Sequence, residues 1–476
     1  MRLHKIILQL NDKNYKFLVS QLKESKADKF LALLTSYREK KVSDNDLMEQ
    51  LDMKQAAFYT LKSRLYDKVQ ESLYKNITDT RVELLQNVAN IKYLIYKIPR
   101  ETAIGILNKL EKELLENDMP NELISVYKAL ILLHIHSKKY YSYQQLYNKH
   151  IAFNLAQDKA EELLSLFCKT LSDYYLTRDP QTLELLVLYK KEMQNVCNVY
   201  QSHHLRVFKN ILNIHFALFS PVESEMKNDP NIEDLLKELT EIIKSHPEDR
   251  TYKHLVQVVD FLYFEYYHQL KLHKNAATYY EKLVDNTATF LLFDHCCFAA
   301  HFLVSKVKHS LAEQLELFLY QDSRSSEYEP TPENVPEFIL YNWYLACSSF
   351  YSEKYTDAAN SLKKVINEIG LKNFTYSEIE IKLFLSLLEI LNGKIDQAEI
   401  NIRSVSRKIA EEDDEVKYFV ASTFLKLLKI AIKLQFKGKF EKLVELNQMF
   451  EALNVGKERV FECVKLNENV LKQLSK

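Results

Sequence analysis

Histidine and cysteine are the residues of this chain whose side chains could hold a metal ion or serve in acid–base chemistry. They lie next to one another in three places: His134 with His136, His203 with His204, and the run from His295 to Cys297. All three places lie in apolar stretches with helical spacing, and residues one or two apart on a helix point in different directions. Two such side chains cannot share one ion, so the spacing predicts no zinc site.

Other patterns that carry catalytic or cofactor chemistry do not occur in the sequence. It has no glycine-rich phosphate loop, no nucleophile elbow and no H-E-x-x-H. The acidic run at 411–415 is typical of a solvated helix N-terminus, where the helix dipole favours negative charge. We therefore expect a protein that is not an enzyme, with no catalytic residue, metal or cofactor.

Residues 43–66 have the pattern of a helix-turn-helix. Ser43 would cap the first helix, and Asp52 and Met53 would form the turn before the second. Leucines and Phe58 would form the inner face. The second helix would then expose polar and basic side chains of the kind that read the major groove of DNA. These candidate DNA contacts are Lys54, Gln55, Tyr59, Lys62 and Arg64.

Other features of this segment favour an ordinary helical hairpin. The turn lacks the usual glycine, and helical spacing continues beyond Leu65, where a β-wing would begin in many DNA-binding domains. Residues 38–75 hold eight Lys or Arg against seven Asp or Glu, a weak footprint for phosphate binding. The sequence leaves both interpretations open.

The elements that must position these residues are helices, as the composition indicates. The chain has 476 residues, 47% of them hydrophobic, but only five Gly and nine Pro, too few for a β-rich or α/β protein of this size. The net charge of −1 gives no global case for nucleic acid or an anionic membrane. Six scattered cysteines without a C-x-x-C predict reduced, buried thiols. With no signal peptide and no membrane-spanning stretch, we expect a cytoplasmic protein without membrane insertion.

Three short stretches in the last third of the chain follow one pattern. Each has a turn residue, a Lys, a bulky residue, and then a small or apolar residue three places later. They begin at Glu353, Gly393 and Gly438, so the copies start 40 and then 45 residues apart. This period is the mark of stacked helical hairpins. Break signals divide the chain into an N-terminal helical subdomain with the helix-turn-helix-like segment (1–78), degenerate helical repeats (79–320), a Pro-rich loop (321–337), clearer repeats (338–453) and a C-terminal capping helix (454–476).

The clearer repeats resemble tetratricopeptide repeats. In that family the first helix carries a Leu–small pair and a small residue opens the second helix. The matching residues are Leu345-Ala346 with Ala358, and Leu385-Ser386 with Ala398. These units are longer than the family's usual ~34 residues, and the aromatic residue expected early in the first helix is absent at Asn342 and Lys382. The resemblance is weak over 80–310 and absent before that. It implies an all-α fold, a right-handed superhelix of antiparallel helix hairpins.

The resemblance also implies a groove that binds a peptide or helix of another protein. Its positions in this chain are Trp343, Phe350, Tyr351, Leu383 and Leu387. They are largely apolar, so either the groove takes an apolar partner or the protein's own chain fills it. We therefore expect a non-catalytic protein–protein interaction scaffold or adaptor. The alternative is a DNA-binding transcriptional regulator with the N-terminal helix-turn-helix and a tetratricopeptide-like sensor domain.

Overall fold

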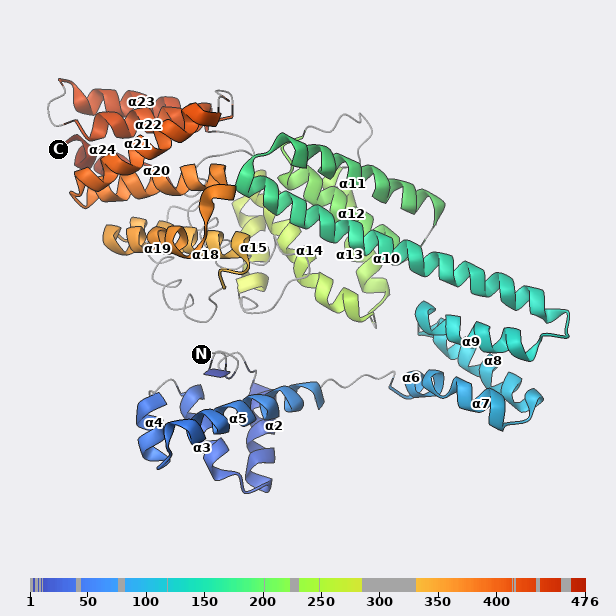
Figure 1. Cartoon of the computed structure of the whole chain (residues 1–476). Coiled ribbons are helices and arrows are strands. Elements are labelled where there is room, and N and C mark those ends of the chain that lie inside the picture. The colour runs from blue at the N-terminus through green and yellow to red at the C-terminus, as the bar shows by residue number, and fades with distance from the viewer. Residues whose placement is uncertain are drawn as a thin grey trace. The chain divides into compact units, whose positions relative to one another are not determined.

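The chain is all-helical wherever the structure, a computed structural model, describes it (Figure 1). The described residues are 3–4, 7, 10, 12–39, 44–75, 82–117, 119–200, 202–222, 231–247, 249–284, 331–412, 414, 417–433, 437–454 and 464–476. They form α-helices and one short 3-10 helix, which confirms the all-α class predicted from the scarcity of Gly and Pro. Two compact units divide the chain, 1–151 and 152–476, and the boundary falls within the long helix α10 (Lys139–Thr177).

The first unit begins with a group of helices that has its own core. They are α2 (Asp12–Glu24), α3 (Asp28–Arg38), α4 (Asp44–Gln50) and α5 (Gln55–Lys75). Phe58, Leu61 and Leu65 of α5 are buried, which confirms the predicted inner face of the second helix. Ser43, the predicted cap, lies outside the described residues.

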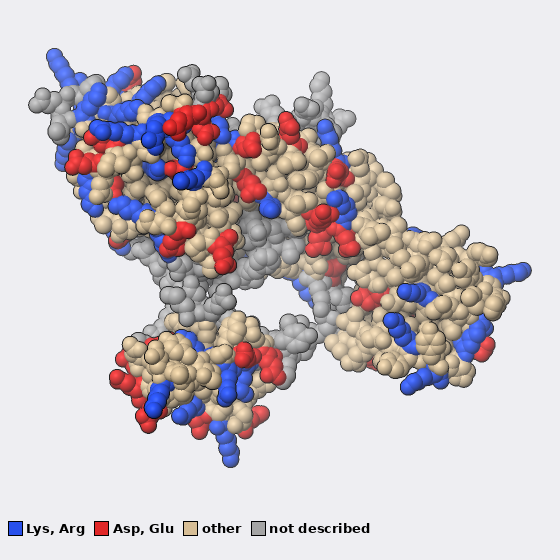
Figure 2. Space-filling view, viewed as in Figure 1, with Lys and Arg blue, Asp and Glu red and all other residues tan. Residues whose placement is uncertain are grey.

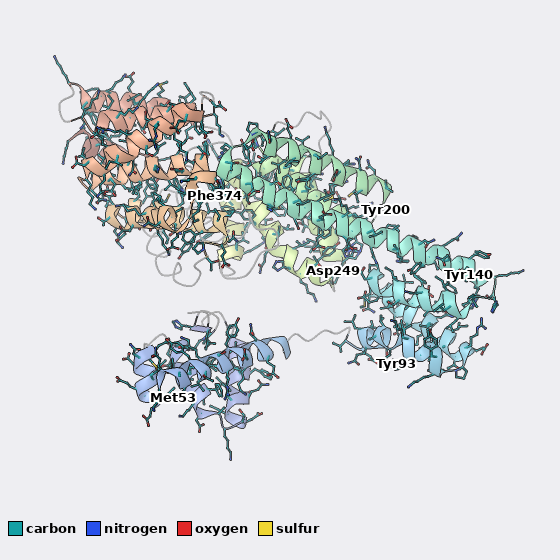
Figure 3. All side chains as sticks on the ribbon, viewed as in Figure 1. Met53, Tyr93, Tyr140, Tyr200, Asp249 and Phe374 are labelled. Atoms are coloured by element: carbon teal, nitrogen blue, oxygen red, sulfur yellow. The ribbon has the colours of Figure 1, made fainter. Side chains whose placement is uncertain are left out.

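The turn between α4 and α5 holds a left-handed residue where glycine is usual. Asp52 has φ 47°, and the Met53 N–H donates to the Met48 carbonyl at 3.0 Å, which closes the end of α4. Asp and Asn tolerate this conformation better than other residues with a side chain. Asp52 therefore takes the place of the glycine that the sequence lacks; Met53, beside it, is labelled in Figure 3.

The first unit continues with a second helical group that also has its own core. Its helices are α6 (Val82–Ala89), α7 (Ile91–Lys97), α8 (Arg100–Glu116), α9 (Pro120–Leu133) and the start of α10. Pro120 opens α9, where its missing N–H costs no hydrogen bond. Leu107, Leu114, Val126 and Leu130 are fully buried at the centre of this group.

The second unit begins with the later part of α10 and the helices that share its core. These are α11 (Pro180–Val199), α12 (His203–Phe219), α13 (Ile232–Ser245), α14 (Arg250–Gln269) and α15 (His273–Val284). A polar side chain accepts a backbone N–H at the start of four of them and so satisfies a donor that the helix cannot pair. These caps are Asp179, Ser202, Asn231 and Asp249.

The last part of the second unit is built from helix pairs. Its elements are α18 (Val335–Tyr351), α19 (Tyr355–Glu368), the 3-10 helix η2 (Leu371–Asn373), α20 (Thr375–Leu391), α21 (Ile395–Glu412), α22 (Phe419–Ala431), α23 (Lys439–Leu453) and α24 (Glu468–Ser475). Helices α18 and α19, α20 and α21, and α22 and α23 pack as pairs, and each pair packs against the next. We call these six helices the three helix pairs.

The repeated stretches of the sequence are the turns within these pairs. Glu353, Gly393 and Gly438 have φ values of 58°, 73° and 72°, so all three occupy the left-handed region. Glycine adopts this conformation without strain, which explains two of the three copies.

Two predicted boundaries shift in the structure. The expected loop over 321–337 lies outside the described residues as far as 330, and α18 already begins at Val335. Pro336 lies in the first turn of that helix, where a proline removes no intrahelical hydrogen bond. At the C-terminus, 455–463 lie outside the described residues, and the expected helix of 454–476 is α24.

Candidate functional site

Most of the predicted groove residues lie inside the protein. Phe350 of α18 and Leu383 and Leu387 of α20 are buried in the core of the three helix pairs. Trp343 is half-buried, with its ring centroid 5.1 Å from that of Phe384. Phe350, Leu383 and Leu387 therefore offer no surface to a partner. The sequence left open whether a partner or the protein's own chain covers the predicted groove. At these three positions, the protein's own chain covers the side chains.

The segment that packs against this core is the C-terminal segment, residues 464–476. Its apolar side chains are buried in the core of the helix pairs: Val464, Leu466, Val470, Leu471 and Leu474. Helix α24 packs on α23, its neighbour in sequence, and also on α20 of the middle pair. A helix that only capped the last pair would not reach the middle one, so the C-terminal segment extends back along the array.

Polar contacts fix the segment at tyrosines from the first helix pair. The Lys465 N–H donates to the Tyr351 hydroxyl at 3.1 Å, and the Tyr355 hydroxyl donates to Gln473 Oε1 at 3.2 Å. The start of α24 is capped by Asn467, whose Oδ1 accepts the Val470 N–H at 2.9 Å. We call the surface formed by α20, α23, Tyr351 and Tyr355 the seat of the C-terminal segment. Among the predicted groove residues, Tyr351 therefore contacts the C-terminal segment through its hydroxyl.

Charged groups inside the three helix pairs are paired across helices. Lys363 Nζ of α19 lies 2.5 Å from Glu389 Oε1 of α20, without the angles of a hydrogen bond, and the Glu389 side chain is 0% exposed. Glu378 of α20 accepts from Lys382 at 2.6 Å and from Lys408 of α21. Burial opposes ionisation of Glu378, but the two lysines outweigh it and hold its pKa below the ordinary value. These pairs were not predicted, because acids inside an apolar run carry no sign of their partners.

A buried arginine joins α10 to α20. The Arg178 guanidinium lies 5.1, 4.8 and 4.9 Å from the ring centroids of Tyr174, Tyr175 and Tyr376. Rings at these distances attract a cation through their negative faces. The Ser377 hydroxyl at the start of α20 also donates to the Leu176 carbonyl at 3.2 Å.

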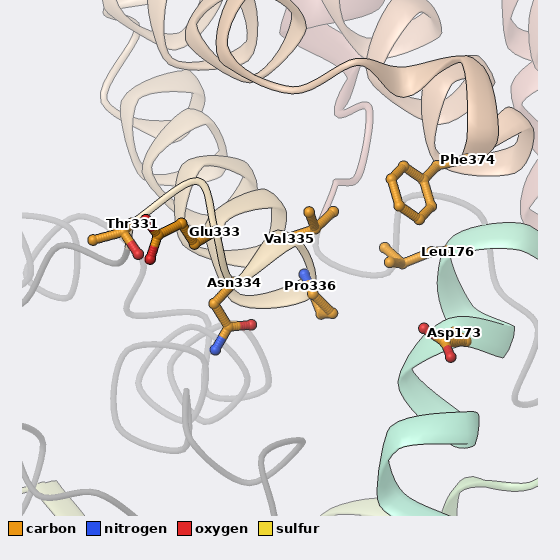
Figure 4. A pocket seen from close by; sticks show the side chains of 8 residues that line it. All are labelled: Asp173, Leu176, Thr331, Glu333, Asn334, Val335, Pro336 and Phe374. Atoms are coloured by element: carbon orange, nitrogen blue, oxygen red, sulfur yellow. The ribbon is translucent and has the colours of Figure 1, made fainter.

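A hollow of about 470 Å³ lies beside this junction (Figure 4). Its lining residues are Asp173, Leu176, Thr331, Glu333, Asn334, Val335, Pro336 and Phe374. Burial raises the pKa of Asp173, but no hydrogen bond in the described part of the chain joins its carboxylate to a base or nucleophile.

Three histidines meet where α12, α13 and α14 come together, beside Asp249, which Figure 3 labels. The rings of His203 and His246 stack with centroids 3.8 Å apart, and His204 Nε2 lies 2.8 Å from Asp249 Oδ2. His203 Nδ1 lies 2.7 Å from the Tyr252 hydroxyl. Among the described residues, no group of three His, Cys, Asp or Glu side chains has a geometry that could hold a metal ion. This cluster joins helix ends through stacking and hydrogen bonds.

The candidate DNA contacts on α5 divide into two sets. Lys54, Gln55, Tyr59 and Arg64 are exposed. Lys62 has a side chain only 13% exposed, and its Nζ donates to Asp44 Oδ2 at 2.7 Å. Lys62 is therefore paired within the N-terminal helices, whereas the other four predicted contacts are exposed.

Comparison with known proteins does not assign the chain to a family. No family model matches it, and no curated protein matches it significantly. No helix in the part of the chain that the structure describes is both long and apolar enough to cross a bilayer.

Proposed function

We propose that this protein is a non-catalytic interaction scaffold, whose three helix pairs bind an amphipathic helix of a partner at the seat of the C-terminal segment. The observation that carries the proposal is the segment itself, which occupies the seat with an eight-residue helix. Val470, Leu471 and Leu474 follow i, i+1, i+4 spacing, so their side chains share one face of α24. A partner helix with the same pattern would make the same contacts.

The chemistry of the seat is that of a helix-binding surface. Apolar side chains supply most of the stabilisation, and the hydroxyls of Tyr351 and Tyr355 fix position. The polar contacts to these hydroxyls come from one backbone N–H and one amide side chain, which many helical ligands can provide. The likeness of these repeats to tetratricopeptide repeats, a family that binds peptides and helices, supports the same function. The bound state of the C-terminal segment then keeps the seat closed until a partner competes for it.

A peptide exchange experiment tests this proposal. A chain that ends at residue 463 is mixed with a fluorescein-labelled peptide of residues 464–476, and binding is followed by anisotropy. We expect the shortened chain to bind the peptide and the full chain to bind it far less, since its own segment competes at high effective concentration. The matched control is the same peptide with Leu471→Asp and Leu474→Asp, which places charge at two buried positions and should not bind.

A second form of the experiment covers the case in which the shortened chain does not fold. A protease site introduced between residues 455 and 463 allows cleavage after folding, and the labelled peptide is then added. Exchange of the labelled peptide for the cleaved segment supports a displaceable ligand. Permanent retention of the segment, or loss of the fold on its release, contradicts the proposal and makes the segment a fixed part of the core.

DNA binding by α5 is a second candidate function, favoured by the turn geometry at Asp52 and by the exposed set on the second helix. Lys54, Gln55, Tyr59 and Arg64 all face solvent, as reading residues of a recognition helix must. Charge reversal at Lys54 and Arg64 should abolish binding of mixed-sequence duplex DNA, measured by gel shift at low salt. Duplex binding that survives both reversals, or no binding by the unaltered protein, contradicts this function.

A further inference from the structure

One end of the second helical group in the first unit combines basic and aromatic side chains. The residues come from the α7–α8 junction and from the α9–α10 junction, which the hydrogen bond from Arg100 Nε to the Leu133 carbonyl brings together at 2.6 Å. We call this surface the basic–aromatic end, formed by Tyr96, Lys97, Arg100, Lys138, Lys139 and Tyr141. Figure 2 shows blue side chains on this part of the molecule with little red between them.

A buried histidine packs within the α9–α10 junction. His134 lies with its ring stacked on Tyr143, centroids 5.2 Å apart, and its Nδ1 lies 3.2 Å from the Ser137 hydroxyl. Burial, together with the charges of Arg100 and Lys139, lowers the pKa of His134. The same two charges therefore lie close to one ring, although they are far apart in sequence. The basic–aromatic end is a structured surface.

The positive charge of this end has little acidic compensation. Residues 123–157 contain four lysines and no Asp or Glu, and residues 84–100 likewise contain no acid. Lys138 and Lys139 form no ion pair with any described residue. Arg100 has one acidic partner among the described residues, the exposed Glu101, whose Oε1 lies 3.4 Å from Arg100 Nη1. Some exposed cations elsewhere pair along their helices, as Arg403 does with Glu399 at 2.5 Å. Lys138 and Lys139 therefore present positive charge to solvent without an acidic partner among the described residues.

The tyrosines at this end are held out into solvent. Tyr96 is 80% exposed and Tyr141 is 74% exposed; Figure 3 labels their neighbours Tyr93 and Tyr140. Tyr93 is also exposed, with Lys97 Nζ 5.3 Å from its ring centroid. An exposed aromatic ring offers surface for stacking, and a cation beside it suits a ligand that carries negative charge next to a flat ring system.

We propose that the basic–aromatic end binds single-stranded nucleic acid, with bases stacked on Tyr96 and Tyr141 and phosphates next to Lys97, Arg100, Lys138 and Lys139. Unpaired bases alternate with phosphates along a single strand, which is the combination that this surface complements. A duplex hides its base faces and can use only the lysines and the arginine. An acidic protein segment can pair with the cations, but its carboxylates do not stack on the exposed tyrosine rings at the two junctions. This site is separate from the seat and does not depend on the scaffold function.

Fluorescence anisotropy with a fluorescein-labelled oligothymidylate tests the proposal on the full chain. We expect binding at low salt that weakens as potassium chloride is raised. The variant Lys138→Glu with Lys139→Glu should lose at least tenfold in affinity and lower the salt slope by about 1.4, the value for two phosphate contacts to a single strand. The variant Tyr96→Ala with Tyr141→Ala should lose about tenfold or more with an unchanged salt slope.

Matched controls separate this site from other cationic surfaces. Lys372→Glu with Lys394→Glu reverses two exposed lysines of the second unit and should leave binding unchanged. Ile400→Ala with Phe419→Ala removes two exposed apolar side chains of the same unit and should also leave binding unchanged. Lys54→Glu with Arg64→Glu tests the α5 surface. Binding lost with that variant, or equal binding of duplex with no effect of the tyrosines, overturns the proposal. So does the absence of binding at low salt, in which case an acidic protein partner becomes the ligand to test.

Discussion

The interior of the second unit and the basic–aromatic end of the first use the same residue types in opposite ways. In the second unit, Arg178 is enclosed by tyrosines, and Lys363 and Lys408 face glutamates. At the basic–aromatic end, Tyr96 and Tyr141 face solvent, and Lys138 and Lys139 have no acidic partner among the described residues. The first arrangement places cations against rings and carboxylates within the fold, and the second leaves both kinds of side chain exposed to solvent. Composition is therefore a poor guide to function here, and the pairing of each cation is a better one.

The largest expected difference between the two regions concerns the removal of one lysine. Lys363→Met leaves the fully buried Glu389 carboxylate without its cation, and we expect a loss of about 3 kcal/mol in the free energy of unfolding. Lys139→Met removes a solvent-facing cation and should change that free energy by less than about 0.5 kcal/mol. Urea unfolding followed by Trp343 fluorescence measures the first variant, since this single tryptophan lies within the three helix pairs. Circular dichroism measures both.

The double variant Lys363→Met with Glu389→Leu provides the control for this comparison. Replacement of both partners by apolar groups should restore most of the lost stability, because no buried charge remains. A Lys363→Met protein as stable as the unaltered one would mean that the buried pair contributes nothing.

Titration distinguishes the two regions next. Burial lowers the pKa of His215 in α12 to about 4 from 6.5, so the unfolded chain takes up this proton first as pH falls. Stability is complete above pH 6.5 and decreases toward pH 4, by up to about 1.4 kcal/mol per pH unit and about 3 kcal/mol in all. His215→Asn should flatten this part of the stability profile. If the free energies of unfolding of the unaltered protein and of His215→Asn differed by the same amount at every pH, a lowered pKa of His215 would be contradicted.

The smallest expected effect concerns Lys62, which the sequence grouped with exposed lysines and the structure groups with paired ones. Lys62→Ala should lower the stability of the N-terminal helices by about 1 kcal/mol through the lost bond to Asp44, and Lys54→Ala should not. Hydrogen bonds from Lys62 and Tyr37 outweigh burial and hold the pKa of Asp44 below 3.8. The contribution of this pair is therefore present above pH 3.8 and is lost as pH falls further. Equal stability of the two alanine variants at neutral pH would mean that the pair of Lys62 with Asp44 contributes nothing to the free energy of unfolding.

Local rules in the sequence predicted the elements well. Scarcity of Gly and Pro predicted the helical class, and apolar spacing predicted the buried face of α5 at Phe58, Leu61 and Leu65. The repeated turns were found because each needs a left-handed residue, a requirement that acts over a few neighbours. Glycine supplies it at Gly393 and Gly438, and the hairpin at Glu353 was recognisable only from the rest of the pattern.

Long-range features could not be predicted in the same way. Apolar Leu383 and Leu387 look the same whether a partner or the chain itself covers them. The answer depends on how helices far apart in sequence pack around α20, which the residues next to Leu383 and Leu387 do not reveal. Likewise, Lys62 and Lys138 carry the same charge, but only the position of Asp44 shows that one of them is paired. The absence of acids over 123–157 is a signal for the basic–aromatic end that is present in the sequence. It belongs to no known motif, so a search for motifs does not find it.

Hydrogen exchange of the full chain, read by mass spectrometry, tests the central claim that the C-terminal segment is a displaceable ligand of its seat. The account predicts that amides of α24 exchange through a local opening, faster than those of α20 and α23 on which it packs, while the three helix pairs stay protected. It also predicts that excess peptide 464–476, added in trans, increases exchange in the chain's own α24 by competing for the seat. Protection of α24 equal to that of α20, unaffected by the peptide, would contradict the account, because the segment would then open only when the whole domain unfolds.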